Sequence, residues 1–123
     1  MGFAKQRVLV VEDETLVRMA IVDRLEDEGF TVFEAANADE AIDILINNLD
    51  IRVMFTDIDM PGGMDGLKLA AAVRDRWPPV KIVVTSGYRY VRDDEIPAES
   101  RFFPKPYDPD AIARVVRSMA AAK

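Results

Sequence analysis

The chain contains neither cysteine nor histidine among its 123 residues. Without cysteine it can form no disulfide and offers no thiolate nucleophile or thiolate metal ligand. Without histidine it lacks the usual general base, the usual imidazole metal ligand and the side chain of a histidine phosphocarrier. Any metal binding or covalent chemistry therefore depends on carboxylates, hydroxyls and amines.

Long apolar runs and an excess of positive charge are also missing. No apolar stretch approaches the roughly 20 residues of a membrane span, and residues 1–7 lack the apolar core of a signal peptide. The formal net charge of −6 argues against a nucleic-acid surface. We expect a cytoplasmic protein that binds neither nucleic acid nor membrane, organised as one domain over residues 1–123 with a core at about 7–120.

Strand-like and helix-like patterns alternate along the chain. Short apolar runs typical of buried strands are Arg7–Val11, Thr31–Ala35, Val53–Thr56, Val80–Thr85 and Arg101–Phe103. Helical spacing occurs from Leu16 to Gly29, after the N-cap Asn37, from Asp65 to Arg76, and over Ala111–Ala121 after Asp108-Pro109. The stretch Tyr88–Ser100 is weakly patterned, so we expect a short or irregular fourth helix there.

This alternation predicts an α/β protein with a doubly wound, five-stranded parallel sheet and helices on both faces. The flavodoxin-like strand order 2-1-3-4-5 is common for such sheets, and we expect it here.

Polar side chains stand where the predicted strands end: Glu12-Asp13, Asp57, Thr85-Ser86 and Lys105. Because the carboxyl ends of parallel strands share one edge, we expect three carboxylates, a hydroxyl pair and an ammonium group to converge. Three carboxylates at one point repel one another, and this repulsion can be relieved by a bound cation, by Lys105 or by raised pKa values of the carboxylates. Oxygen ligands without histidine or cysteine favour a hard divalent ion, magnesium by default.

Taken singly, each residue has a simpler interpretation. Asp57 can end its strand, Glu12-Asp13-Glu14 can favour a helix N-terminus, and Lys105 can be a solvated loop residue. Their joint placement outweighs these interpretations. A carboxylate beside a cation and an ammonium group is suited to accept a phosphoryl group, and a hydroxyl from Ser86 can donate to one of its oxygens.

These motifs resemble the receiver domain of two-component response regulators. The matching segments are Val8–Glu14, Asp57–Pro61, Met64–Gly66, Thr85–Gly87 and Lys105-Pro106. The resemblance implies that Asp57 is phosphorylated by a sensor histidine kinase or a histidine phosphotransfer protein. It implies that Glu12, Asp13, Asp57 and the backbone carbonyl of Asp59 surround Mg²⁺, and that Lys105 contacts the phosphoryl group. Residues 61–64 make their loop one residue longer than its commonest form.

The resemblance also implies a switch. Ser86, followed by the small Gly87, fits the switch hydroxyl better than the runner-up Thr85, and Phe102 is the expected switch aromatic. Phosphorylation would then change the surface around Tyr88–Phe103 and the last predicted helix, Ala111–Ala121, either to control a downstream target protein or to pass the phosphoryl group on in a phosphorelay. We hypothesise that Tyr88 shields the acyl phosphate from water.

Other expectations follow from the same resemblance. We expect a monomer or a weak, phosphorylation-dependent dimer without an output domain, and not an enzyme beyond its own phosphotransfer and autodephosphorylation.

Two rival functions fit parts of the pattern. A Mg²⁺-dependent phosphatase with an aspartate nucleophile places a second Asp two residues after the first, and Asp57-Ile58-Asp59 has that spacing. The early Glu12-Asp13 pair and the lack of room for a cap domain argue against it. A flavin-binding electron carrier would need a phosphate-binding loop after the first strand, where Glu12-Asp13-Glu14 would repel phosphate.

Overall fold

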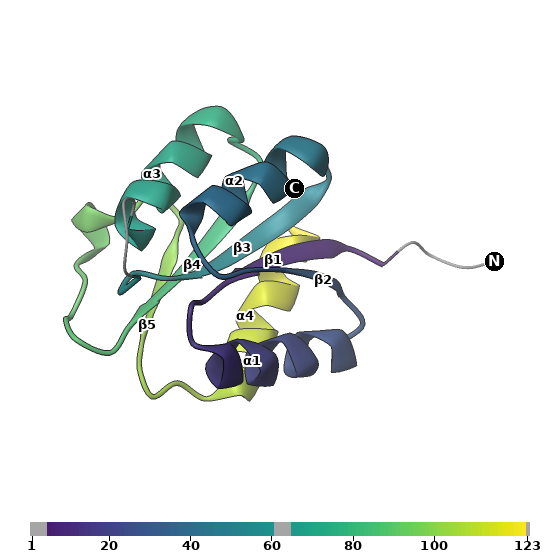
Figure 1. Cartoon of the computed structure of the whole chain (residues 1–123), viewed down its shortest axis with the longest axis horizontal. Helices are drawn as coiled ribbons and strands as arrows, with labels where there is room; N and C mark the ends of the chain where they lie inside the picture. The colour runs from purple at the N-terminus through teal and green to yellow at the C-terminus, as the bar shows by residue number, and fades with distance from the viewer. Residues whose placement is uncertain (1–4, 61–64, 123) are drawn as a thin grey trace.

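The computed structural model describes residues 5–60 and 65–122, which form five strands, four α-helices and one short 3₁₀ helix (Figure 1). In chain order they are β1 (Arg7–Val11), α1 (Thr15–Asp27), β2 (Thr31–Ala35), α2 (Ala38–Asn47), β3 (Ile51–Asp57), α3 (Gly66–Arg76), β4 (Lys81–Ser86), η1 (Asp93–Glu95), β5 (Arg101–Pro104) and α4 (Pro109–Ala121). The longer loop expected at 61–64 lies outside the described residues.

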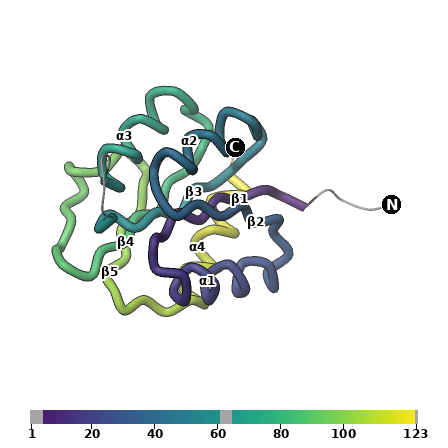
Figure 2. Tube along the Cα trace, viewed as in Figure 1, coloured from purple at the N-terminus to yellow at the C-terminus, as the bar shows by residue number. Residues whose placement is uncertain are grey.

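The five strands form one parallel sheet in the order β2-β1-β3-β4-β5. Helices α2 and α3 cover one face and α1 and α4 cover the other, as the ribbon and the tube both show (Figures 1 and 2). The predicted flavodoxin-like fold and strand order are therefore confirmed.

Alternation along the strands divides the core between these two faces. In β1, Leu9 and Val11 pack with α2 and α3, whereas Val8 and Val10 pack with α1 and α4. Because β1 and β3 are central and covered on both faces, they are apolar at nearly every position. The first polar side chains after these runs therefore emerge together at the carboxyl edge of the sheet.

Local sequence signals account for the starts of α2, α3 and α4. The side chain of Asn37 accepts a hydrogen bond from the Glu40 amide at 2.9 Å, and Asp65 caps α3 through the Lys68 amide at 2.9 Å. Helix α4 begins at Pro109, where a missing N–H costs nothing.

The connection between β4 and β5 contains only the three-residue η1, which agrees with the expected short or irregular fourth helix. Pro97, two residues after η1, disfavours a longer helix here. Arg74 of α3 donates to the Ala98 carbonyl at 2.6 Å and fixes this connection beside α3 (Figure 2).

Strand β3 is longer than predicted, because it starts at Ile51 and includes Asp57. The side chain of Arg52 is exposed and interrupts the apolar run, so the apolar pattern does not reveal the first two residues of the strand. Among the described residues, no helix has the length and apolar character needed to cross a bilayer.

Candidate functional site

Three carboxylates meet at the carboxyl edge of the sheet. Oxygen atoms of Glu12, Asp13 and Asp57 all lie within 4.8 Å of one another. Pairing of Val11 with Thr56 aligns the ends of β1 and β3, so each strand delivers its first acidic residue to the same point. Glu12 and Asp57 are buried, and Asp13 is half-buried.

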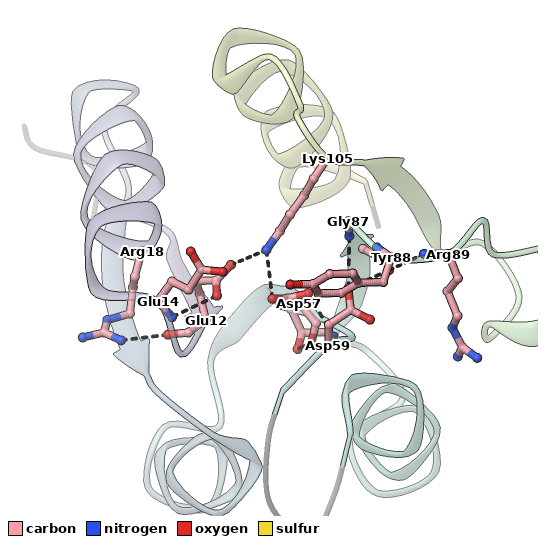
Figure 3. A network of polar contacts seen from close by, with 11 residues as sticks. Glu12, Glu14, Arg18, Asp57, Asp59, Gly87, Tyr88, Arg89 and Lys105 are labelled. Atoms are coloured by element: carbon pink, nitrogen blue, oxygen red, sulfur yellow. Dashed lines mark hydrogen bonds and ion pairs between the residues drawn. The ribbon is translucent and has the colours of Figure 1, made fainter.

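Lys105 supplies the counter-charge from the loop after β5. Its Nζ lies 3.1 Å from Glu12 Oε1 and 2.9 Å from Asp57 Oδ2 (Figure 3). The Lys105 amide donates to the Ser86 carbonyl at 2.9 Å, which holds the root of the side chain against the end of β4. One ammonium group therefore serves two buried carboxylates.

Two residues at the start of α1 and just before it hold Glu12 in place. The Glu14 amide donates to Glu12 Oε2 at 3.1 Å, and Arg18 of α1 donates to the Glu12 carbonyl at 2.7 Å (Figure 3). Both contacts fix Glu12 in place. Its carboxylate thus cannot turn away from Asp57 without losing the hydrogen bond from the Glu14 amide.

Titration of the site reflects this crowding. Burial raises the pKa of Glu12 to about 7, and the Glu14 amide opposes that rise while the charge of Asp57 adds to it. Burial alone would lower the pKa of Lys105, but its hydrogen bonds to Asp57 and Glu12 hold that pKa above its usual range. Burial likewise raises the pKa of the neighbouring Tyr107 to about 12.

The donor set fits a hard divalent cation. It consists of oxygen atoms only, and its three carboxylates exceed the single positive charge of Lys105. Burial, and then the nearby charge of Asp57, raise the pKa of Glu12, and a bound cation would favour its ionised form. The expected ligands Glu12, Asp13 and Asp57 are thus brought together in a suitable arrangement.

Asp59 joins this site to the end of β4. Its amide donates to Asp57 Oδ1 at 3.0 Å, and its Oδ2 accepts a hydrogen bond from the Gly87 amide at 3.0 Å (Figure 3). The same Oδ2 accepts a hydrogen bond from the Ser86 hydroxyl at 2.7 Å. The sequence predicted a role for the backbone carbonyl of Asp59, but not this contact of its side chain with Ser86. The available signal was a second acidic side chain opposite a hydroxyl at the next strand end.

The two candidate hydroxyls differ in their surroundings. Ser86 Oγ also accepts from the amides of Tyr88 and Arg89, at 3.2 and 3.3 Å. Thr85 is fully buried, and its Oγ1 has no hydrogen-bond partner in the part of the chain that the structure describes. The strand pleat turns the two side chains to opposite faces, and only Ser86 joins the polar network.

The aromatic residues of β5 also lie on opposite faces. Phe102 packs against the core on the α2 and α3 side and meets Tyr90 edge-to-face, with ring centroids 5.6 Å apart. Phe103 packs against the other core. Tyr88, the expected shield, is 88% exposed. Phe102 therefore links the interior to the exposed connection that carries Tyr90.

Gly66, which the sequence predicts at the start of a helix and within a segment that matches the receiver family, also lies against the backbone of Asp57. A Cβ at this position would lie 2.2 Å from the Asp57 carbonyl oxygen and 2.6 Å from the Ile58 Cα. The Gly66 amide donates to the Ile58 carbonyl at 3.2 Å. The first turn of α3 therefore packs directly on the backbone of Asp57, and only glycine leaves room for it.

An apolar groove of about 540 Å³ runs from Lys105 along α1. Its mouth carries Leu16, whose side chain is 81% exposed. The groove is lined by Leu16, Val17, Ala20, Ile21, Gly87, Lys105, Pro106, Tyr107 and Pro109. Exposed apolar surface thus directly adjoins the acidic site.

Comparison with known proteins places these features in a family. Residues 8–117 match the model of the response regulator receiver domain. The chain is 36% identical over 116 residues to the sensor kinase CckA of Brucella abortus, a match that covers 91% of this chain and 12% of that protein. The chain thus spans about one eighth of the length of this relative.

Solved structures agree with this match. The receiver domain of the hybrid histidine kinase CckA superposes with a TM-score of 0.79 at 32% identity, covering 93% of this chain and 98% of that one. The response regulator TrrA of Thermotoga maritima, in complex with Mg²⁺ and BeF, gives 0.80 at 26% identity, with coverage of 93% and 98%. No enzyme family is indicated, and the phosphatase alternative is not favoured. The chain belongs to the response regulator receiver domain family of two-component signalling.

Proposed function

We propose that Asp57 is the phosphoacceptor of this receiver and takes its phosphoryl group from a histidine of a sensor kinase or phosphotransfer protein. The observation that carries this proposal is the buried Asp57 carboxylate, bound by Lys105 Nζ at 2.9 Å and grouped with Glu12 and Asp13. A carboxylate held in this way is oriented for attack and has a positive charge beside it.

In the transfer, an oxygen of Asp57 forms a bond to phosphorus while the phosphorus–nitrogen bond of the donor phosphohistidine breaks. The electron pair of that bond leaves with the imidazole, which takes up a proton. Lys105 stabilises the charge on the phosphoryl oxygens. When held by Glu12, Asp13, Asp57 and the Asp59 carbonyl, Mg²⁺ supplies further positive charge to the same oxygens.

The switch rests on Ser86. Its hydroxyl is proposed to turn toward the phosphoryl group, and Phe102 then fills the space that it leaves. In the structure, the Tyr88 and Arg89 amides donate to Ser86 Oγ and so order the start of the β4–β5 connection. The movement of Ser86 breaks both hydrogen bonds. Phosphorylation thus shifts the population between two packings of one surface. Ser86 is preferred over Thr85, because Thr85 lies outside the polar network.

A donor protein must bring its phosphohistidine to Asp57 across this edge of the sheet. The groove beside Lys105 and the exposed Leu16 offer apolar contact area next to the reacting group. We propose that this surface receives the donor protein.

The remaining expectations stay proposals. The partners are a histidine-containing donor and a downstream target protein or the next carrier of a phosphorelay, rather than nucleic acid or a membrane. The net charge of −6 and the receiver family are consistent with a cytoplasmic location. The organisation of residues 1–123 as one domain and the monomeric or weakly dimeric state stay predictions.

The direct test is intact-mass measurement after incubation with acetyl phosphate. The wild type should gain one phosphoryl group in Mg²⁺ and none in EDTA, and Asp57→Asn should gain none. A folded wild type that gains no mass, or an Asp57→Asn variant that gains it equally, would overturn the proposal. Turnover of a simple phosphate ester would instead favour the phosphatase alternative.

A further inference from the structure

We propose that the Asp59 carboxylate is a positioning residue that holds the Ser86 hydroxyl and competes for it with a phosphoryl group on Asp57. This inference rests on the proposed function, in which Ser86 turns to the phosphoryl group. It assigns the side chain of Asp59 a role separate from that of its backbone carbonyl.

The competition follows from the number of protons. A serine hydroxyl has one proton to donate. In the structure that proton goes to Asp59 Oδ2 across 2.7 Å, the usual length of an O–H···O hydrogen bond. Ser86 therefore cannot donate to a phosphoryl oxygen until it releases Asp59.

Asp59 is itself fixed at both ends. Its amide donates to Asp57 Oδ1 at 3.0 Å, and its Oδ2 also accepts from the Gly87 amide at 3.0 Å. It therefore spans from the phosphoacceptor to the residue after Ser86. Ser86 is only 2% exposed, so water cannot readily replace a lost partner.

Release of Ser86 also affects the β4–β5 connection. The same oxygen accepts the amides of Tyr88 and Arg89, so a rotation of Ser86 leaves both N–H groups to find other partners. The strength of the Asp59 contact thus sets how often the hydroxyl is free. Since only that fraction of molecules can bind a phosphoryl group fully, Asp59 lowers the apparent affinity of the site.

Asp59 also carries a negative charge near the phosphoryl position, and charge repulsion alone would lower the affinity too. Two substitutions separate these effects. Asp59→Asn removes the charge but keeps a carbonyl oxygen that can accept from Ser86 and Gly87, whereas Asp59→Ala removes both. The positioning role predicts that Asn lies closer to the wild type than Ala does, while pure repulsion predicts equal effects.

The experiment is a beryllium fluoride titration of the full chain in Mg²⁺, followed by NMR shifts of the Tyr88 and Arg89 amides. Asp59→Ala should lower the half-saturating concentration about tenfold, a factor that corresponds to about 1.4 kcal/mol. In a Ser86→Ala background, the Asp59→Ala effect should vanish, because no hydroxyl remains to be held. Circular dichroism verifies that each variant is folded.

Each outcome has one meaning. Equal shifts for Asn and Ala, or an Asp59→Ala effect that persists with Ser86→Ala, would overturn the positioning role in favour of charge repulsion. Wild-type affinity in Asp59→Ala would overturn this inference and leave the proposed function intact. A wild type that does not respond to beryllium fluoride in Mg²⁺ would overturn the proposed function and this inference with it.

Discussion

Replacement of Gly66 by alanine should displace the backbone of Asp57, although Gly66 itself has no side chain in the phosphoacceptor site. The added Cβ would lie 2.2 Å from the Asp57 carbonyl oxygen, 2.6 Å from the Ile58 Cα and 2.8 Å from the Asp57 carbonyl carbon. All three are backbone atoms, so no side-chain rotation relieves the overlap. To reach ordinary contact at about 3.5 Å, α3 and the end of β3 must separate by roughly 1 Å.

The magnitude follows from two effects. Overpacking costs roughly 1–3 kcal/mol, and contact with three backbone atoms places Gly66→Ala at the upper end of that range. The better helix propensity of alanine returns up to about 1 kcal/mol, so we expect a net loss near 2 kcal/mol in the free energy of unfolding. A displacement of about 1 Å at a reacting group is also expected to slow phosphorylation roughly 100-fold.

Two other glycines provide matched controls. At Gly87, a Cβ would meet only Lys105 side-chain carbons at 3.5 and 3.6 Å, which is ordinary contact. At Gly29, a Cβ meets nothing within 4 Å, but the φ of +102° strains any other residue. Gly29→Ala should therefore lose stability by about 1 kcal/mol without slowing phosphorylation.

Urea unfolding and the rate of mass gain from acetyl phosphate measure both effects. If Gly66→Ala unfolds like the wild type and is phosphorylated at the wild-type rate, the close packing of α3 on Asp57 does not matter and the reasoning is refuted. If it loses only stability, as Gly29→Ala should, then Asp57 keeps its position despite the overlap.

Four further predictions concern the site and its surroundings. The pKa of Glu12 is raised from 4.5 to about 7, so its protonated form stabilises the fold below pH 4.5, and this stabilisation is lost as the pH rises through 7. In metal-free buffer the free energy of unfolding of the wild type should therefore fall by roughly 3 kcal/mol between about pH 4 and pH 8, and Glu12→Gln should abolish this fall. Equal pH dependence in urea unfolding of the two proteins would contradict this. Lys105→Met should lower the free energy of unfolding at pH 8 by roughly 3 kcal/mol, because two buried carboxylates lose their counter-charge, and an unchanged unfolding midpoint would show that this ion pair contributes little. Phe102→Ala should keep mass gain from acetyl phosphate but weaken the NMR response of the β4–β5 connection; a loss of phosphorylation as large as in Asp57→Asn would mean that the proposed roles are wrongly divided. Tyr88→Ala should shorten the lifetime of the phosphorylated form, and an unchanged rate of mass loss would exclude shielding by Tyr88.

The strands and the convergence of the acidic residues were predictable because buried parallel strands are apolar until they end. Glu12, Asp13 and Asp57 are the first acidic residues after two such runs, and the shared edge of the sheet brings them together. Lys105 reaches them because its loop starts at the same edge. These conclusions need only the pattern of apolar residues along the chain and the parallel direction of the strands.

The roles of Asp59 and Gly66 were not predictable in this way. The contact between Asp59 and Ser86 depends on the direction of a side chain in the loop after β3, which the strand pattern does not determine. The overlap at Gly66 depends on how closely a helix approaches a strand, a distance set by packing. Ile51 and Arg52 at the start of β3 were missed because the exposed Arg52 breaks the apolar run.

The central claim is that the phosphoryl group is attached to Asp57, and borohydride trapping tests it most directly. After incubation with acetyl phosphate and Mg²⁺, borohydride reduces an aspartyl phosphate to homoserine, and peptide mapping locates the changed residue. The account predicts homoserine at position 57 alone, and none when EDTA replaces Mg²⁺. Homoserine at Asp13 or Asp59 instead, or none in a folded wild type, would contradict it.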